Sequence, residues 1–277
     1  MIKTGQINQL KLIRKSPQGY YLDGQGADDI LLPTQYVPDN VHFGESLEVF
    51  VYRDSEDRLI ATTLEPLAKV GEFACLKVVS TNRFGAFLDW GLPKDLMVPF
   101  SEQRRKLREG ECVVVYVYLD ENTDRVVAST KLNRWLNQGP IPYKTGDQVQ
   151  VMIYEETSLG FKVIINGQHT GMLYENEVFT VLHLGDTREA TIKKIREDGK
   201  IDLSLQKSIA DSVQSTSAII LRELEKSEGF LPFTDKTPAT EIYSHFGVSK
   251  KNFKKALGAL YKQRSILIEK DGIRANR

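Results

Sequence analysis

The sequence predicts a mostly β protein with an α/β C-terminal part, and three observations lead to this prediction. First, three glycine positions recur with the same spacing in three consecutive stretches of the chain. Second, each stretch contains short runs rich in Val, Phe, Tyr and Thr that are separated by turn signals. Third, the pattern changes after residue 210 to the apolar spacing of amphipathic helices.

The glycine repeat indicates three copies of one structural unit. A "KTG" or "KVG" tripeptide opens each copy, a second glycine follows 14 residues later, and a third stands 25 residues further on, before an acid. The three sets are Gly5, Gly19, Gly44; Gly71, Gly85, Gly110; and Gly146, Gly160, Gly185. Such periodicity is the sequence signature of a repeated domain.

Within each copy the residue pattern is typical of short β-strands. The second copy reads "EFACLKVV", "GAFLDW", "DLMVPF", "CVVVYVYL" and "RVVAST", separated by "STNRFG", "WGLPKD" and "DENTDR". Five strands with one longer connection between the third and the fourth are typical of a small Greek-key barrel, and the five-stranded OB-fold is the candidate. We therefore expect OB-type domains over residues 1–66, 67–137 and 138–210.

The last domain, residues 211–277, has the pattern of a winged helix. An amphipathic helix is expected in "SVQSTSAIILRELEKSEG", and a second in "TPATEIYSHF", with Thr237 as N-cap and Pro238 at the first helical position. Ser249 is the expected cap of the third helix, "KKNFKKALGALYKQR", and "SILIEKDGIRA" reads as a hairpin. This order of elements is a variant of helix-turn-helix.

A family resemblance starts from the second repeat and the C-terminus. "FGAFLDWGLPKDLMVPFSE", followed by "REGECVVVYVYLD" and "RVVASTK", resembles the S1-type RNA-binding domain. Three such modules before "GFLPFTDKTPATEIYSHFGVSKKNFKKALGALYKQ" resemble the conserved virulence factor B family of bacterial RNA-binding regulators. The resemblance implies a protein that binds RNA and controls gene expression after transcription, including virulence or stress genes.

The same resemblance implies a stacking site in the second repeat. Phe84 and Phe87 match the two aromatic positions of the S1 pattern, whereas Pro99 replaces its histidine. Lys77, Arg83 and Lys94 are the expected phosphate partners on this face. Aromatic side chains suit single strands because every base offers a π-face.

The other two repeats lack the aromatic pair. Gln18 and Tyr21 occupy its positions in repeat one, and Leu159 and Lys162 occupy them in repeat three. An aromatic residue in a strand usually belongs to the core, but a shared core position would not become Lys162. We therefore expect repeat two to bind best, repeat one partly through Tyr21, and repeat three least.

A cationic face is expected on the third helix of the C-terminal domain. At 100° per residue, Phe253, Ala256, Leu257 and Leu260 face the core. The opposite arc carries Lys250, Lys251, Lys254 and Lys255, and no acid occurs between Ser249 and Ile268. Such a face is often only a solvated surface, but on a recognition helix it favours phosphate contact.

Composition narrows the function classes. Lys+Arg and Asp+Glu both total 37, but residues 67–137 carry 11 basic and 9 acidic side chains (+2) and residues 211–277 carry 12 and 8 (+4). A polyanion should therefore prefer these two segments. The two cysteines lie in apolar runs and are expected to be buried, reduced thiols. Neither a secretory signal nor a membrane span is expected, so the chain should be cytoplasmic.

Motifs for catalysis are missing from the sequence. No Walker loop, GxSxG, GxGxxG or HExxH occurs, and the four histidines are scattered. We therefore expect no enzyme activity, no cofactor and no metal. The leading interpretation is a protein that binds single-stranded RNA; the alternatives are a regulator that binds duplex DNA through the winged helix, and an adaptor associated with the ribosome or the RNA-decay machinery.

Overall fold

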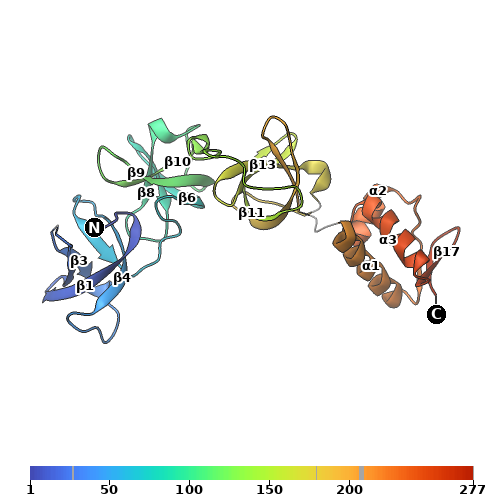
Figure 1. Cartoon of the computed structure of the whole chain (residues 1–277), viewed down its shortest axis with the longest axis horizontal. Helices are drawn as coiled ribbons and strands as arrows, with labels where there is room; N and C mark the ends of the chain where they lie inside the picture. The colour runs from blue at the N-terminus through green and yellow to red at the C-terminus, as the bar shows by residue number, and fades with distance from the viewer. Residues whose placement is uncertain (27, 179, 206–208, 277) are drawn as a thin grey trace. The chain divides into compact units, whose positions relative to one another are not determined.

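The computed structural model describes residues 1–26, 28–178, 180–205 and 209–276. It confirms the mostly β class, with three closed five-stranded barrels followed by a helical C-terminal domain (Figure 1). The strands of barrel 1 are β1 Gln6–Ser16, β2 Gly19–Leu22, β3 Ile30–Pro33, β4 Ser46–Arg53 and β5 Leu59–Thr62. Those of barrel 2 are β6 Phe73–Thr81, β7 Gly85–Asp89, β8 Leu96–Pro99, β9 Cys112–Leu119 and β10 Val126–Ser129. Those of barrel 3 are β11 Gln148–Thr157, β12 Gly160–Ile165, β13 His169–Tyr174, β14 Thr187–Ile195 and β15 Ile201–Ser204.

The three barrels share one topology. In barrel 2 the strand order is β10-β8-β7-β6-β9, and β9 pairs with β10 to close the sheet. The third and fifth strands run parallel, with Met97 opposite Val127, while the other neighbours are antiparallel. Full closure leaves no free sheet edge, so each barrel hides its backbone hydrogen-bonding groups without help from a neighbour.

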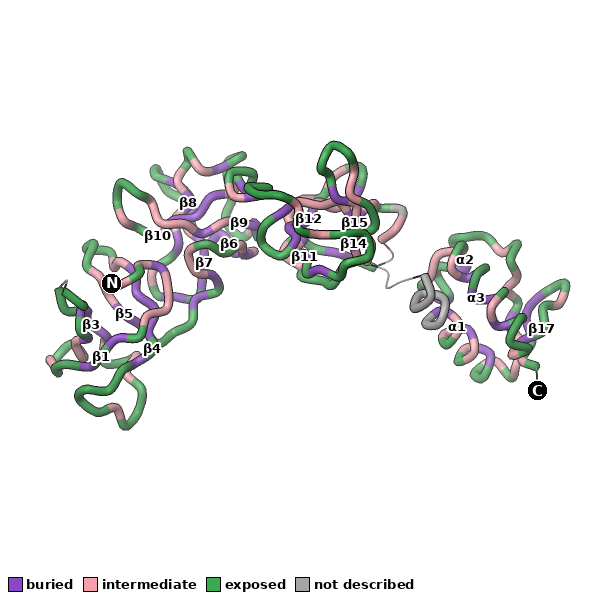
Figure 2. The backbone as a smooth tube through the Cα atoms, in the orientation of Figure 1, coloured by how far each residue is buried: buried purple, intermediate pink, exposed green. Residues whose placement is uncertain are grey.

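Alternation along the strands places the cores inside the barrels. On β6, Ala74, Leu76 and Val78 are buried, whereas the residues between them are partly or fully exposed (Figure 2). Side chains of a strand point alternately to the two faces of the sheet. The residues left outside, including Phe87, are therefore the ones available to a ligand.

Gly85 explains one of the three repeated glycine positions. A Cβ at this position would overlap the carbonyl oxygen of Val98 on the neighbouring strand. The same clash would occur at Gly19 with Leu32 and at Gly160 with Leu173. Glycine therefore recurs at this position because the two strand backbones approach too closely for a side chain to fit.

Barrels 1 and 2 belong to one compact unit, and aromatic packing joins them. The ring of Trp90 lies 5.7 Å from that of Phe50 in an edge-on arrangement and 6.3 Å from that of Tyr52. Trp90 is only 2% exposed, and its indole nitrogen donates to the carbonyl of Lys94 at 2.6 Å. Trp90 is therefore a packing residue between the two barrels.

The C-terminal domain contains the expected helices and hairpin. Its elements are α1 Ile209–Lys226, β16 Phe230–Leu231, α2 Ala239–Phe246, α3 Lys250–Lys262, β17 Ile266–Ile268 and β18 Ile273–Ala275. The Ser249 side chain accepts a hydrogen bond from the amide of Asn252, as expected of an N-cap. Residues 206–208, beside the boundary expected at 210, lie outside the described residues.

Two details of this domain differ from expectation. Pro238, not Thr237, occupies the N-cap of α2, and the Thr237 hydroxyl accepts from the amide of Thr234 instead. In addition, β16 pairs with β18 and extends the hairpin to three strands. Two residues are too short a run to show alternation, which is why the sequence pattern missed this strand.

The expectation that both cysteines are buried is wrong. Cys75 is partly exposed and Cys112 is exposed, because both lie on the outward face of their strands. Burial is still sufficient to raise the pKa of the Cys75 thiol to about 11. Among the described residues no helix is both long and apolar enough to cross a membrane.

Candidate nucleic-acid interface

The aromatic pair of barrel 2 lies on the outer face of β7 and in the turn before it. The side chain of Asn82 accepts hydrogen bonds from the amides of Phe84 and Gly85, at 2.8 and 3.3 Å. This turn projects Phe84 outward, where 56% of its surface is exposed. Phe87, two residues after Gly85, is half-buried and pairs with Met97 of β8. Both rings are therefore placed on the surface and not in the core.

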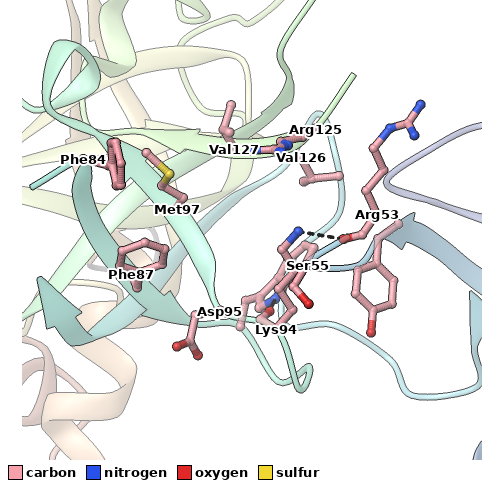
Figure 3. A pocket seen from close by; sticks show the side chains of 12 residues that line it. Arg53, Ser55, Phe84, Phe87, Lys94, Asp95, Met97, Arg125, Val126 and Val127 are labelled. Atoms are coloured by element: carbon pink, nitrogen blue, oxygen red, sulfur yellow. Dashed lines mark hydrogen bonds between the residues drawn. The ribbon is translucent and has the colours of Figure 1, made fainter. Parts of the chain in front are cut away.

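A cavity of about 390 Å³ opens beside the two rings (Figure 3). Barrel 2 and the end of barrel 1 both line it, and one wall is largely apolar. The lining residues are Tyr52, Arg53, Ser55, Phe84, Phe87, Trp90, Lys94, Asp95, Met97, Arg125, Val126 and Val127. An apolar wall with a few polar groups is the common make-up of a ligand site.

Charged groups occupy the side of the cavity opposite the phenylalanines. The Lys94 ammonium donates to the carbonyl of Arg53 at 2.9 Å (Figure 3) and to that of Asp54 at 2.7 Å. Burial lowers the pKa of Lys94, and the charge of Arg125 lowers it further. Burial also raises the pKa of Asp95, with a contribution from Asp89. Two of the three ammonium donors are thus used by the protein, and one remains for a ligand.

The equivalent faces of the three barrels differ in the residue that pairs with the second aromatic position, which is Phe87 in barrel 2. In barrel 2 the residue paired with Phe87 is Ser80, which is too small to cover the ring. In barrel 1 Arg14 pairs with Tyr21, and its guanidinium carbon lies 3.5 Å from the ring centroid.

In barrel 3 the same position is charged and already paired. Lys162 lies opposite Glu155, with 3.2 Å between ammonium and carboxylate. A base could stack on this face only by displacing an ion pair. The uncovered ring is therefore a property of barrel 2.

The structure brings some of the expected residues together and separates others. Phe84, Phe87 and Lys94 line one cavity, and the Arg83 guanidinium carbon lies 4.8 Å from the centroid of the Phe84 ring. Lys77 is exposed on β6, opposite Asp89, and does not line the cavity. Its role in phosphate binding stays a prediction, as does that of every residue in this set.

The lysines of α3 divide into two pairs. The Lys250 ammonium donates to the carbonyl of Lys236 at 3.3 Å, and that of Lys254 lies 3.5 Å from the Asp235 carboxylate. Lys251 and Lys255 are exposed, and no ion pair involves them within the described part of the chain. Phe253, Ala256, Leu257 and Leu260 are buried on the other arc, as expected.

Sequence reasoning missed several residues of the cavity. Met97 and Arg125 could have been predicted from the sequence. The second and third strands and the loop between the fourth and fifth strands form the usual ligand face of an OB-fold. Tyr52, Arg53 and Ser55 carried no signal at all. They belong to barrel 1, and only the packing of the two barrels brings them to this face.

Comparison with known families agrees with this architecture. The S1 domain family matches residues 4–64 and 70–131, and the CvfB-like winged helix domain family matches residues 218–274. These are nucleic-acid-binding types of domain. The chain therefore carries nucleic-acid-binding modules at both ends.

Relatives match this chain over nearly its full length. Conserved virulence factor B of Staphylococcus epidermidis is 27% identical over 276 residues, covering 96% of this chain and 92% of the relative. YitL of Bacillus subtilis is 25% identical, covering 97% and 92%. A crystal structure described as a multidomain protein with nucleic acid binding domains, from Streptococcus pneumoniae, is 23% identical, covers 98% of each chain and superposes with a TM-score of 0.45.

Proposed function

The chain belongs to the conserved virulence factor B family, and from this premise we propose that it binds single-stranded RNA and regulates gene expression after transcription. One observation carries the proposal. Phe84 is exposed and Phe87 is half-buried on the outer face of an OB-type barrel, and both line a cavity with cationic groups. In this proposal bases stack on the rings, while Arg83 and Lys94 meet phosphates.

The chemistry of this face favours a single strand over a duplex. Stacking on a side chain needs an unpaired base, whereas a duplex offers its phosphates and groove edges. A stacked base and a phosphate contact carry little sequence information. In this proposal the protein binds single-stranded RNAs of many different sequences, acts in the cytoplasm and catalyses no reaction itself.

A second candidate is duplex DNA binding by the winged helix. The observation that favours it is the exposed pair Lys251 and Lys255 on α3, the helix that enters the major groove in helix-turn-helix proteins. The barrels would then only position this domain.

Competition separates the two candidates. A labelled single-stranded RNA is bound to the full chain and challenged with unlabelled RNA of the same sequence or with duplex DNA. Under the proposal only the RNA displaces the label efficiently. Efficient displacement by duplex DNA would replace the proposal with the second candidate.

A further inference from the structure

The cavity beside Phe87 has two walls, and they come from different barrels. Phe84, Phe87 and Met97 of barrel 2 form the first. Arg53 and Ser55, at the end of β4 and in the loop that follows, contribute to the second. In an isolated barrel 2 the phenylalanines would still face Lys94 and Arg125, but the wall contributed by Arg53 and Ser55 would be missing.

Reciprocal contacts hold the barrel 1 loop in place. Arg125 of barrel 2 donates from Nε to Asp57 Oδ1 at 2.7 Å, and its terminal nitrogen contacts the other carboxylate oxygen. Arg53 of barrel 1 donates to the Asp124 carboxylate at 2.6 Å and to its carbonyl at 3.1 Å. Each barrel thus offers an arginine to an aspartate in the corresponding loop of the other.

Lys94, which also lines the cavity, makes a third contact between the two barrels. Its ammonium donates to the carbonyls of Arg53 and Asp54, so a side chain of barrel 2 holds the backbone of barrel 1. Backbone carbonyls are present whatever the loop side chains are. The position of the second wall is therefore set by barrel 2.

We propose that barrels 1 and 2 form one composite site for a single unpaired nucleotide of RNA. The base enters between the phenylalanine wall and the Asp54–Arg58 loop, and Asp57 and Arg125 act as positioning residues that keep the loop at the right separation. This inference rests on the proposed function, since it specifies how the same aromatic face takes its ligand. Barrel 1 then serves chiefly as part of the barrel 2 site, in keeping with its own covered Tyr21.

Charge reversal of the positioning pair tests the proposal in the full chain. The probe is a single-stranded oligoribonucleotide of about six nucleotides, within the site size of an OB-fold, carrying one 2-aminopurine whose fluorescence falls on stacking. Asp57→Arg and Arg125→Asp should each weaken binding by about threefold or more, because each puts like charges opposite one another. The double variant, which restores an opposite-charge pair, should recover the affinity and the quenching.

A matched control separates positioning from general electrostatics. Glu56→Arg makes the same charge change one residue away, where the carboxylate pairs with Arg58 of its own loop at 2.8 Å. It should bind the probe as well as the wild type or better. If Asp57→Arg behaves like Glu56→Arg, the loop does not need the pair and the composite site is wrong.

The remaining outcomes are also informative. If the double variant stays as weak as Arg125→Asp, Arg125 contacts RNA itself and the positioning role is overturned. Phe87→Ala serves as the reference for the proposed function. If it weakens binding while the charge variants do not, the RNA site stands and the composite site falls; if it has no effect, the proposed function itself fails.

Discussion

Phe87 on β7 lies directly opposite Met97 on β8, and Met97 in turn lies opposite Val127 on β10, all on the outer face of barrel 2. The aromatic ring is therefore the first member of an apolar row that crosses three strands on this face and ends at the buried Val127. Tyr21, Leu31 and Ile60 form the corresponding row in barrel 1. The two rows differ in what covers the ring, which makes Phe87 the position to test first.

Phe87→Ala should weaken binding of single-stranded RNA by about 1–3 kcal/mol, because one stacked base is lost. The free energy of unfolding should change little, since the ring lies outside the barrel. Phe253→Ala, in the buried core of the winged helix, is the control and should cost about 3–5 kcal/mol in folding. Urea unfolding beside a binding titration measures both quantities. A large loss of stability in Phe87→Ala would mean that this ring is core and that the site is misplaced.

The affinity for single-stranded RNA should fall linearly with salt concentration on a log–log scale. Phosphate contacts release bound counterions, and single strands contribute a slope of about −0.7 per contact. Titrations at several salt concentrations, with RNAs of different sequence, give the slope and the sequence preference together. A flat response would contradict a surface built on Arg83, Lys94 and the α3 lysines.

Changing Lys250, Lys251, Lys254 and Lys255 together to Ala should weaken binding to all long RNAs alike. The salt slope should become shallower by up to about 0.7 for each lost phosphate contact. The structure sharpens this prediction. Lys251→Ala with Lys255→Ala should account for most of the change, because Lys250 and Lys254 already contact Lys236 and Asp235.

Short oligonucleotides that cover only barrel 2 provide the control for the lysine variants, and they should bind as before. If both ends of the chain hold one long RNA, the second contact is intramolecular and the affinities multiply. Suppose instead that the quadruple variant keeps its affinity for long RNA and loses duplex DNA. The winged helix would then be a DNA reader, as in the second candidate function.

Gly85→Ala should destabilise the unit of barrels 1 and 2 by at least about 1–3 kcal/mol, the usual cost of forcing atoms into a packed region. The added methyl group would meet the Val98 carbonyl, which is backbone and has little room to move. Gly139→Ala is the matched control, because its Cβ would meet no atom within 4 Å. It should change stability by no more than about 0.5 kcal/mol. Equal unfolding midpoints for the two variants would refute the close approach.

The contact between Asp57 and Arg125 should respond to acid. The hydrogen bond from Arg125 lowers the pKa of Asp57, opposed by partial desolvation and supported by the charges of Arg125, Lys94 and Arg53. A carboxyl with a lowered pKa stabilises the fold above its ordinary pKa of about 4, and this contribution is lost as the pH falls through the lowered value. The thermal midpoint of the wild type should therefore exceed that of Asp57→Asn at neutral pH and converge with it only in acid. A constant difference down to low pH would show that the pair does not titrate.

The sequence by itself determined the architecture and the outward position of the aromatic pair of barrel 2. Identical glycine spacing identified three copies, and positions such as Gly85 recur because the close approach of two strands allows only glycine there. Alternation along the strands separated inward from outward residues, and the 3.6-residue period of α3 separated Phe253 from the lysines. These are local rules, in which each residue constrains its near neighbours in the chain. These rules failed for the two-residue strand β16, which is too short to show alternation. They also failed by one residue at the start of α2, where Pro238 and not Thr237 is the N-cap.

Only the tertiary structure decided what lies around that face. Ser80, Arg14 and Glu155 stand opposite the same position in three barrels, and cross-strand pairing determines whether the ring is open, covered or replaced by an ion pair. The second wall of the cavity depends on contacts between residues about 70 positions apart, such as Arg53 with Asp124. No periodicity of the chain encodes such a contact, because it arises when two finished barrels pack through Trp90. The sequence therefore indicated which aromatic face is exposed, and the packing of the barrels determined the shape of the cavity beside it.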